Sequence, residues 1–284
     1  MSSSLDPVPI AGVALIDIIP PRGWLSLELG ELWRFRDLAY FFVWRTIKIR
    51  YKQTAIGAAW AIIQPVAEML VFTVFFGYLA RIPSGDTPYP IFYLSALLPW
   101  TYFAGALQNV TNSVVEQQHI VTKVYFPRLL LPLSAALPGL LDFAIGLFVL
   151  FPIMILYRIV PGKAILLLPA FLLLAMVTAL SVGLWLAALN SLYRDVRYIV
   201  PFLVQIWMFV SPVAYPASLV PEHWRWLYGL NPMAGVIEGF RWTLTGHGQP
   251  PTLLLAVSMV VVAVVLVGGL AFFRRMEDTI ADVV

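Results

Sequence analysis

Long apolar stretches, each followed by a short polar segment, dominate the hydropathy pattern of this chain. A membrane-crossing helix needs about 20 consecutive apolar residues, and windows of about 19 residues locate such helices in a sequence. Read in this way, the pattern predicts six transmembrane helices and an all-α integral membrane fold. The expected spans are residues 55–80, 90–110, 129–157, 164–190, 198–215 and 252–273.

The composition supports a membrane protein and excludes several other classes. Hydrophobic residues make up 61% of the 284 residues, charged residues make up 12%, and the mean hydropathy is +0.86. Soluble domains are usually about 45–50% apolar and about 25% charged, so an ordinary cytosolic enzyme, a disordered chain and a nucleic-acid-binding protein are excluded. The chain has no cysteine, which rules out disulfides and cysteine ligands. The three histidines are scattered, and we expect no metal site.

The distribution of basic residues predicts the orientation of the spans. If the N-terminus is cytoplasmic, 13 of the 18 lysines and arginines fall in cytoplasmic segments. The positive-inside rule then places both termini in the cytoplasm, with residues 55–284 forming the six-helix domain. Residues 1–19 lack the basic region that begins a cleavable signal peptide, so we expect the first span to insert uncleaved. Residues 1–30 form a cytoplasmic segment to which we assign no role.

A segment before the first span has the pattern of an amphipathic helix. Over residues 31–54, basic side chains gather on one face at 100° per residue, and apolar or aromatic side chains gather on the other. Such a helix suits the cytoplasmic membrane interface. It either anchors the chain or moves with a cytoplasmic partner. The polar face carries Arg34, Asp37, Arg45, Lys48 and Lys52.

The cytoplasmic connection between the second and third spans is longer than a plain turn requires. Residues 116–128 read as a short polar-then-apolar helix that ends at a proline. The segment is either the frayed end of the second span or a docking helix for a cytosolic subunit. In the second case the docking residues are Glu116, His119, Lys123, Tyr125, Phe126 and Arg128.

The loop between the fifth and sixth spans, residues 216–250, is the longest external segment and is rich in tryptophan, tyrosine and proline. Tryptophan and tyrosine favour the membrane–water boundary, and prolines end helices. We expect two short external half-helices, residues 221–230 and 232–244, that meet at Asn231. Within the second one, Glu238 and Arg241 are three residues apart and can form an ion pair.

Two acids and many aromatic residues lie within the predicted spans or beside them. Glu68 and Asp142 are costly in a bilayer, so each is either a satisfied structural carboxylate or a group that faces a cavity or a partner. Aromatic rings stack on the apolar faces of sugars, so a subset can line a pore while the others face lipid or neighbouring helices. The candidate pore or gate residues are Trp60, Phe72, Phe76, Phe202, Phe209, Tyr215, Trp224 and Trp226.

The sequence contains no motif for ATP hydrolysis or for covalent catalysis. It has neither a G-x-x-x-x-G-K-[ST] phosphate-binding loop nor a G-x-S-x-G nucleophile elbow. Six spans with a docking-like segment and no energy source imply that the motor is a separate chain.

Several short motifs occur in an order that resembles a known family. They are the basic segment 45–60, Gln64-Pro65, Leu97-Leu98-Pro99-Trp100, residues 190–197, Ser211-Pro212-Val213 with Tyr215, and Asn231-Pro232-Met233. Together they resemble the permease subunits of bacterial ABC exporters for polysaccharides, O antigens and teichoic acids, over about residues 32–277. The positions that match that family's cytoplasmic loop motif are Asn190, Tyr193, Arg194 and Asp195.

This resemblance implies a transport subunit and not an enzyme, in the cytoplasmic (inner) membrane of a bacterium. It implies a homodimer with a pore between the protomers and a lipid-linked polysaccharide as substrate. It also implies two copies of a cytosolic ABC ATPase, which bind ATP and Mg²⁺ and receive the segment 116–128, while this chain holds no cofactor of its own.

Three alternatives stay open at the level of sequence. A permease of the same architecture can export a small lipid or a drug. An integral-membrane enzyme acting on lipid-linked sugars would need clustered acids or a metal site, and the sequence shows neither. A secondary transporter would work without an ATPase, but the inverted pair of broken helices that many such transporters carry is not apparent.

Overall fold

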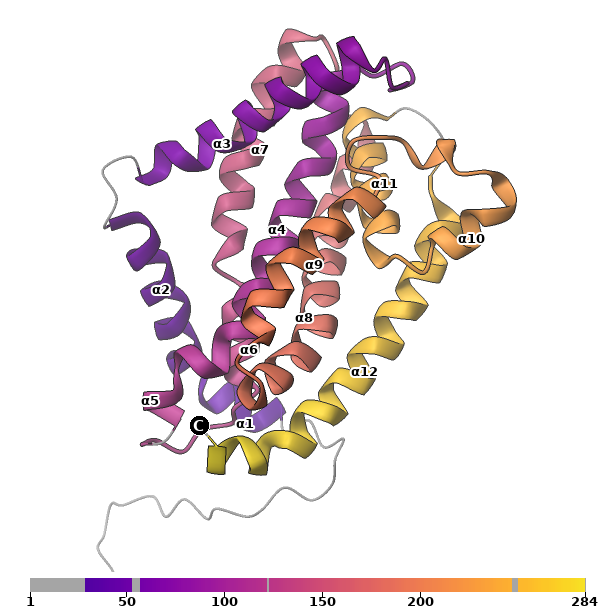
Figure 1. Ribbon diagram of the computed structural model, residues 1–284. Helices are drawn as coiled ribbons and strands as arrows, with labels where there is room; N and C mark the ends of the chain where they lie inside the picture. Colours follow the sequence, from indigo (N-terminus) through magenta and orange to yellow (C-terminus); the bar gives the residue numbers. More distant parts are fainter. Residues whose placement is uncertain (1–28, 53–56, 122, 247–249, 284) are drawn as a thin grey trace, which may run out of the picture.

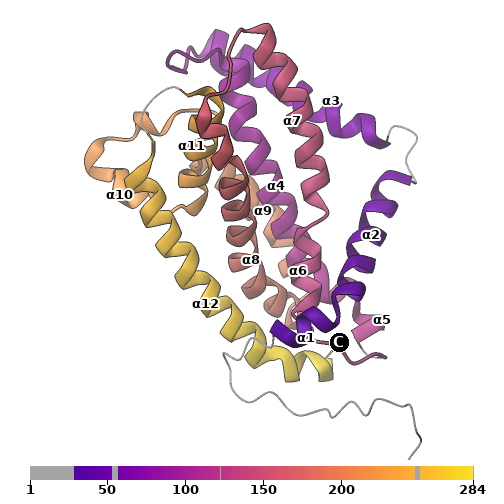
Figure 2. The ribbon, with the colours of Figure 1, turned by 180° about the vertical axis from the view of Figure 1, so that it is seen from behind.

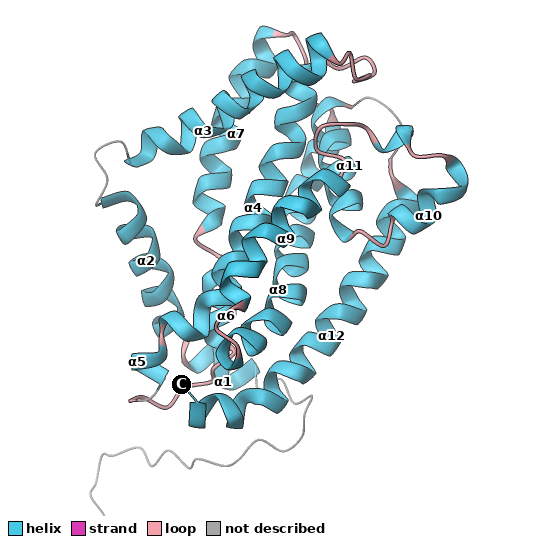
Figure 3. Cartoon of the chain, in the orientation of Figure 1, coloured by secondary structure: helices cyan, strands magenta, loops and turns pink. Residues whose placement is uncertain are grey.

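The computed structural model describes residues 29–52, 57–121, 123–246 and 250–283, and within these ranges every regular element is a helix (Figures 1 and 3). The longer helices are α2 (Arg36–Lys52), α3 (Gly57–Phe72), α4 (Tyr89–Glu116), α7 (Gly139–Leu156), α8 (Leu168–Leu192), α9 (Val196–Val210), α11 (Pro232–Thr245) and α12 (Thr252–Val283). The shorter helices are α1 (Leu29–Arg34), the π-helix η1 (Thr73–Leu79), α5 (Gln118–Val121), α6 (Leu130–Ala136), η2 (Lys163–Leu167), η3 (Ala217–Leu219), η4 (Glu222–Trp224) and α10 (Arg225–Tyr228). The all-α prediction is therefore confirmed for the described residues.

Five stretches of the described residues are long and apolar enough to cross a membrane, and they match five of the six predicted spans. They are Ala59–Leu79, Tyr89–Glu116, Leu130–Leu156, Lys163–Leu192 and Thr252–Glu277. The remaining predicted span, 198–215, forms the 15-residue helix α9. At 1.5 Å per residue α9 is about 22 Å long, which is shorter than the ~30 Å hydrocarbon core. It ends at Val210 because the residue before a proline avoids the helical region, and Ser211 is extended in front of Pro212.

The central helix of the bundle is α4, and α8 packs along both α4 and α12 (Figure 1). In the most apolar stretch of α4, 78% is buried, against 6% in Ala59–Leu79, which lies at the edge of the bundle. Gly183 of α8 allows the close approach of α4, because a Cβ at that position would lie 2.4 Å from Val110 Cγ1. The core is therefore built around one helix, and the outer helices keep large apolar surfaces exposed.

The ends of the described chain lie on one side of the molecule. Helices α1 and α5 and the C-terminal end of α12 gather at one end, while α10 and α11 lie in the opposite half (Figures 1 and 2). The connection that carries the predicted docking residues is therefore on the same side as the first and the last described helices. Most of the predicted N-terminal segment, residues 1–28, lies outside the described residues.

The predicted amphipathic segment forms two helices, α1 and α2, separated at Phe35, where one was expected. Part of its apolar face packs against the bundle, and the buried Phe42 lies against Phe126 with ring centroids 6.1 Å apart. Beyond this contact, α2 rises beside the bundle (Figures 1 and 2). Its last turn reaches α7, where Arg50 forms an ion pair with Asp142. The segment thus extends along the spans as well as covering their ends.

Between α9 and α12 the chain folds back onto the bundle. The second predicted half-helix is α11, which is buried over most of its length. Its first turn is capped by Asn231, whose side chain accepts a hydrogen bond from Met233 N at 3.1 Å, and it ends at Gly246 in the left-handed conformation (φ 67°). The first predicted half-helix is reduced to the short η4 and α10. The helix α11 is therefore an internal element of the fold.

Candidate functional site

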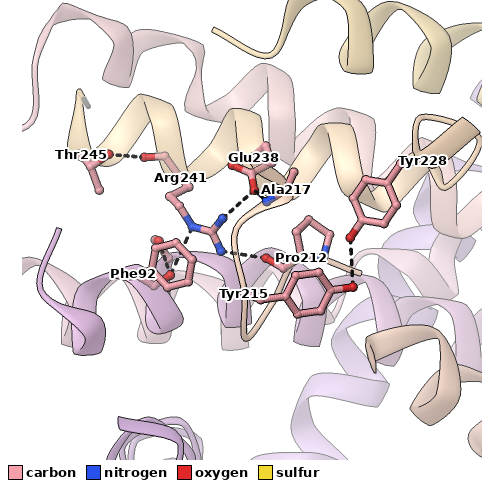
Figure 4. A network of polar contacts seen from close by, with 9 residues as sticks. Phe92, Pro212, Tyr215, Ala217, Tyr228, Glu238, Arg241 and Thr245 are labelled. Carbon is pink, nitrogen blue, oxygen red and sulfur yellow. Dashed lines mark hydrogen bonds and ion pairs between the residues drawn. The ribbon is translucent and has the colours of Figure 1, made fainter. Parts of the chain in front are cut away.

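An ion pair on α11 anchors the turn that follows α9 (Figure 4). Arg241 is 6% exposed, and its guanidinium donates to Glu238 Oε1 at 2.8 Å and to Pro212 O at 2.7 Å. The guanidinium carbon also lies 3.7 Å from the ring centre of Phe92 on α4. Glu238 accepts a second hydrogen bond, from Ala217 N at 2.8 Å. The predicted ion pair is confirmed, and it ties the turn to α11 and α4.

Three tyrosines form further hydrogen bonds around the turn that follows α9. The hydroxyl of Tyr89 donates to Ala214 O at 2.8 Å. The hydroxyl of Tyr228 donates to Tyr215 Oη at 3.2 Å (Figure 4). The hydroxyl of Tyr215 in turn donates to Phe209 O at 3.1 Å. Burial raises the pKa of the Tyr228 hydroxyl far above its usual range. The predicted gate residue Tyr215 is thus fixed at the end of α9.

Asn231 joins the cap of α11 to the end of α9. Its Oδ1 accepts from Trp207 Nε1 at 2.8 Å, and its Nδ2 donates to Ser211 Oγ at 3.0 Å. The sequence identified Asn231 as the junction of two half-helices and as part of the motif Asn231-Pro232-Met233. Its further role is to hold Trp207 and Ser211, which are 24 and 20 residues away along the chain.

A broad apolar face of α9 points away from the bundle. The buried side of this helix is formed by Val200 and Val204. The exposed side consists of Tyr198, Ile199, Phe202, Leu203, Ile206, Phe209 and Val210. This spacing of three and four residues is that of one helix face, and an exposed apolar face of this kind marks contact with lipid or protein. The predicted pore residues Phe202 and Phe209 therefore share one unpartnered surface.

Apart from the half-buried Tyr215, the predicted pore residues outside α9 divide into two groups. Phe72 stacks on Phe76 at 5.1 Å and on Tyr93 of α4 at 4.4 Å between ring centroids. These two phenylalanines therefore pack into the bundle. The exposed members of the set outside α9 are Trp60, Trp224 and Trp226.

The predicted docking segment has both an exposed part and an anchored part. The exposed residues are Glu116, His119, Lys123 and Tyr125. In contrast, Phe126 is 4% exposed and packs on Phe42. The backbone N–H of Arg128 donates to Glu277 Oε1 at 3.2 Å, and its guanidinium donates to Glu277 O. Phe126 and Arg128 thus fasten the segment to α2 and α12, and the exposed residues face outward at that end.

The predicted cytoplasmic loop motif also combines a buried anchor with an exposed turn. Asn190 is 1% exposed, and its Nδ2 donates to Thr111 O at 3.1 Å and to Asn112 Oδ1 at 3.2 Å, which ties α8 to α4. The Oδ1 of Asn190 is buried without a hydrogen-bond partner. The exposed residues of the motif are Tyr193, Arg194 and Asp195, in the turn between α8 and α9.

The two acids within the spans line one cavity. It has a volume of about 770 Å³, lies among α2, α3, α4 and α7, and includes Glu68 and Asp142 in its wall. Asp142 pairs with Arg50 and accepts a hydrogen bond from the hydroxyl of Tyr51. The sequence left open whether each acid is a satisfied structural carboxylate or a group that faces a cavity or a partner. In the structure both line the cavity, and Asp142 is also satisfied by Arg50 and Tyr51. The sequence missed Arg50 as the partner because 92 residues separate the two.

The described residues contain no group of three or more histidine or acidic side chains that could hold a metal ion. The two polar centres of the molecule, around Arg241 and around Asp142, are instead built from ion pairs, amides and hydroxyls. Such groups bind and position a ligand or a neighbouring helix.

Comparison with known protein families matches most of this chain. The family model of the ABC-2 type transporter matches residues 38–245, which include every long helix from α3 to α11. The chain belongs to the ABC-2 transporter family. Together with the five long apolar helices, this membership identifies a multi-pass inner-membrane protein.

Relatives of this ABC-2 chain match it along nearly its whole length. The O-antigen export system permease protein RfbA of Myxococcus xanthus is 28% identical over 253 residues, covering 87% of this chain and 96% of the relative. A protein of the same name from Klebsiella pneumoniae is 24% identical over 260 residues, covering 91% and 98%. The polysialic acid transport protein KpsM of Escherichia coli is 22% identical over 237 residues, covering 82% and 91%.

Proposed function

We propose that this ABC-2 chain is the membrane-spanning subunit of an ATP-driven exporter that moves a lipid-linked polysaccharide out of the cytoplasm. The observation that carries the proposal is the exposed aromatic face of α9 beside an anchored turn, in a chain that matches O-antigen export permeases over 87–91% of its length. A hydroxylated polymer needs a continuous hydrated path, because each polar group transferred unpaired into hydrocarbon costs several kcal/mol. Membrane-spanning helices with an unpartnered aromatic face can supply one wall of such a path.

In this proposal α9 is the fifth of six crossings, and both termini are cytoplasmic. The helix is about 22 Å long, and a short span is accommodated by local thinning of the bilayer. The turn 211–217 continues from its end and is held by Arg241. An even number of crossings is supported by the common position of α1, α5 and the end of α12 (Figure 2).

Two copies of the chain form the pore. The support is the amount of apolar surface that one copy leaves uncovered on α9 and on Ala59–Leu79, of which only 6% is buried. Pairing of these surfaces brings the aromatic faces of both protomers, including Phe202 and Phe209, to the common interface.

A cytosolic ABC ATPase supplies the energy and holds the ATP and Mg²⁺, with one copy on each protomer. Its docking site on this chain is the exposed part of the connection between α4 and α6, around Lys123 and Tyr125. Movement of this segment passes directly to α2, because Arg45 Nη1 donates to Gln117 Oε1 at 3.0 Å and Phe42 packs on Phe126.

Deletion of the gene in the native host tests the function. We expect loss of the surface polysaccharide and retention of the lipid-linked glycan inside the cell, with both reversed by the plasmid-borne gene. Normal surface polysaccharide in the deletion strain would contradict the proposal. If the glycan is normal and a lipid or drug accumulates instead, the chain is a permease for small molecules.

Docking is tested by the double variant Lys123→Ala with Tyr125→Ala. Both side chains are exposed, so we expect normal folding, loss of ATPase co-purification and loss of export. The matched control is Tyr157→Ala, which removes an exposed tyrosine at the C-terminal end of α7. Equal ATPase binding by the double variant and the control would exclude this segment as the docking site.

A further inference from the structure

The cavity among α2, α3, α4 and α7 has mostly apolar walls that carry a small number of polar groups. Its volume of about 770 Å³ is within the ~300–1,000 Å³ of small-molecule sites. Three of its lining residues stand near the midpoints of three different spans: Glu68 in Ala59–Leu79, Tyr102 in Tyr89–Glu116 and Asp142 in Leu130–Leu156. Charged and polar groups at this depth are found where they face one another or a water-filled space. The cavity therefore joins polar groups of all three spans in one place.

The charged residues that line the cavity, Arg50, Glu68 and Asp142, do not neutralise one another completely. The charge of Asp142 is matched by Arg50, and Tyr51 donates a further hydrogen bond to the same carboxylate. Among the described residues, Glu68 has one hydrogen bond, from Gln64 Nε2 at 3.0 Å, and no ion pair. With both acids ionised the lining carries one net negative charge. Glu68 can therefore accept hydrogen bonds from a ligand.

Other lining groups also keep unused hydrogen-bonding capacity. The side-chain amide of Asn109 lines the cavity and makes no hydrogen bond with the residues that the structure describes. The hydroxyl of Thr101 donates to Leu98 O at 3.1 Å and can still accept. Beside these groups the indole of Trp60 lines the same space and is 57% exposed. A carboxylate, amides and an aromatic face thus surround one volume.

We propose that this cavity is a binding site for a neutral, polyhydroxylated sugar unit. Sugar hydroxyls donate to Glu68 and exchange hydrogen bonds with Asn109 and Gln64, while an apolar sugar face lies on Trp60. We take the sugar to be a unit of the exported glycan. In this respect the inference rests on the proposed export function. The site lies within one protomer, separate from the surface formed by α9.

The phosphate of a lipid headgroup fits this wall less well than a neutral sugar. The net charge of the lining is negative, and the guanidinium of Arg50 is already paired with Asp142. A lipid tail, in turn, would give Asn109 no hydrogen bond and would give Glu68 none beyond the one from Gln64, and buried polar groups without enough partners are costly. Charge and hydrogen bonding therefore favour a sugar.

The absence of cysteine from the chain allows a clean test by thiol labelling. Gly105 lines the cavity, and a Cβ built there meets no atom within 4 Å, so Gly105→Cys places a unique thiol in the site without a clash. Gly162→Cys is the control, because Gly162 is exposed outside the cavity and its Cβ also meets nothing within 4 Å. The full chain is purified into phosphatidylcholine nanodiscs and reacted with a hydrophilic maleimide. The probe is the neutral oligosaccharide fraction from partial acid hydrolysis of the host's own surface polysaccharide.

We expect the oligosaccharides to slow labelling at Gly105→Cys and to leave labelling at Gly162→Cys unchanged. Adding Asn109→Leu to Gly105→Cys should raise the half-protecting concentration about tenfold, the effect of one lost hydrogen bond. Because Asn109 bonds to no described residue, this variant should keep its thermal stability. The matched control is Gln108→Leu, which makes the same chemical change at the preceding position, outside the cavity lining.

Three results would overturn the proposal. The first is equal labelling of Gly105→Cys with and without oligosaccharide. The second is protection by phosphatidylglycerol in the nanodisc that oligosaccharide does not change. The third is protection at Gly105 that is insensitive to Asn109→Leu. None of these results touches the proposed export function, which fails only if the deletion strain keeps its surface polysaccharide.

Discussion

Replacing Arg241 with methionine should be one of the most damaging single substitutions in this protein. Methionine keeps the length and packing of the side chain but removes the charge and all of its donors. The change breaks the hydrogen bonds to Glu238 Oε1 and Pro212 O, at 2.8 and 2.7 Å, and leaves Glu238 as a carboxylate whose side chain is only 20% exposed. Removing one partner of a buried ion pair costs about 3–5 kcal/mol. We expect Arg241→Met to lower the free energy of unfolding by that amount.

A matched pair of variants separates this effect from the loss of any arginine. Arg225 and Glu222 form an ion pair at 3.5 Å with side chains 43% and 88% exposed. Exposed pairs are worth about 0.2–1 kcal/mol, so Arg225→Met should cost far less than Arg241→Met. Adding Glu238→Leu to Arg241→Met removes the unpaired carboxylate and should restore part of the stability. The rescue is incomplete because Ala217 N then loses its acceptor, which costs about 1–3 kcal/mol.

Thermal denaturation of the purified variants in detergent, followed by the amount of monodisperse protein that survives heating, measures the order of these effects. The expected order of stability is wild type and Arg225→Met, then the double variant, then Arg241→Met. The reasoning is refuted if Arg241→Met is no less stable than Arg225→Met, or if the double variant is less stable than Arg241→Met.

Two further substitutions test the packing of α11. Gly239→Ala should destabilise the protein by about 1–3 kcal/mol in the same assay, because the new Cβ would lie 2.0 Å from Cε1 of Phe171, a buried ring with little room to move. The control is Gly105→Ala, whose Cβ meets nothing within 4 Å. Asn231→Ala should cost at least the ~0.5–2 kcal/mol of a lost helix cap, since Trp207 Nε1 also loses its acceptor. Asn231→Asp keeps the acceptor oxygen, so it should be the milder change, and equal losses for the two variants would argue against the cap.

Local features of the sequence predicted the parts of the fold that depend on neighbouring residues. Long apolar windows located five spans to within several residues, and the spacing of Glu238 and Arg241 predicted their ion pair. For the fifth span the windows placed the end too late, because Val213 and Ala214 keep the average hydropathy high past the true end of α9. The helix α9 ends where it does because of Pro212, and an average of hydropathy values does not detect the effect of a proline on the backbone.

Contacts between distant segments could not be predicted in the same way. The basic face of residues 31–54 suggested a helix lying on the membrane surface, yet Arg50 reaches Asp142 at the middle of the third span. The cost of a charge in a span indicates that Asp142 needs a partner. With 18 basic residues in the chain, the sequence alone does not say which one. Likewise, the pattern of aromatic residues did not separate Phe72, which stacks on Tyr93, from the exposed Phe202.

The two polar centres differ in how completely their groups are satisfied, and this difference separates a structural role from a binding role. Around Arg241 each charge has its counter-charge and further hydrogen bonds, so the cluster is closed and holds a turn in place. In the second centre the carboxylate of Asp142 is satisfied in the same way, by an ion pair with Arg50 and a hydrogen bond from Tyr51. The carboxylate of Glu68 accepts a hydrogen bond only from the side-chain amide of Gln64. An acid at the centre of a span costs about 2.5–3.5 kcal/mol on insertion scales, and a single amide does not offset that cost. Glu68 is therefore tolerated because water or a ligand reaches it through the cavity, and a Glu68→Leu variant that folds more stably but exports less would follow from the same reasoning.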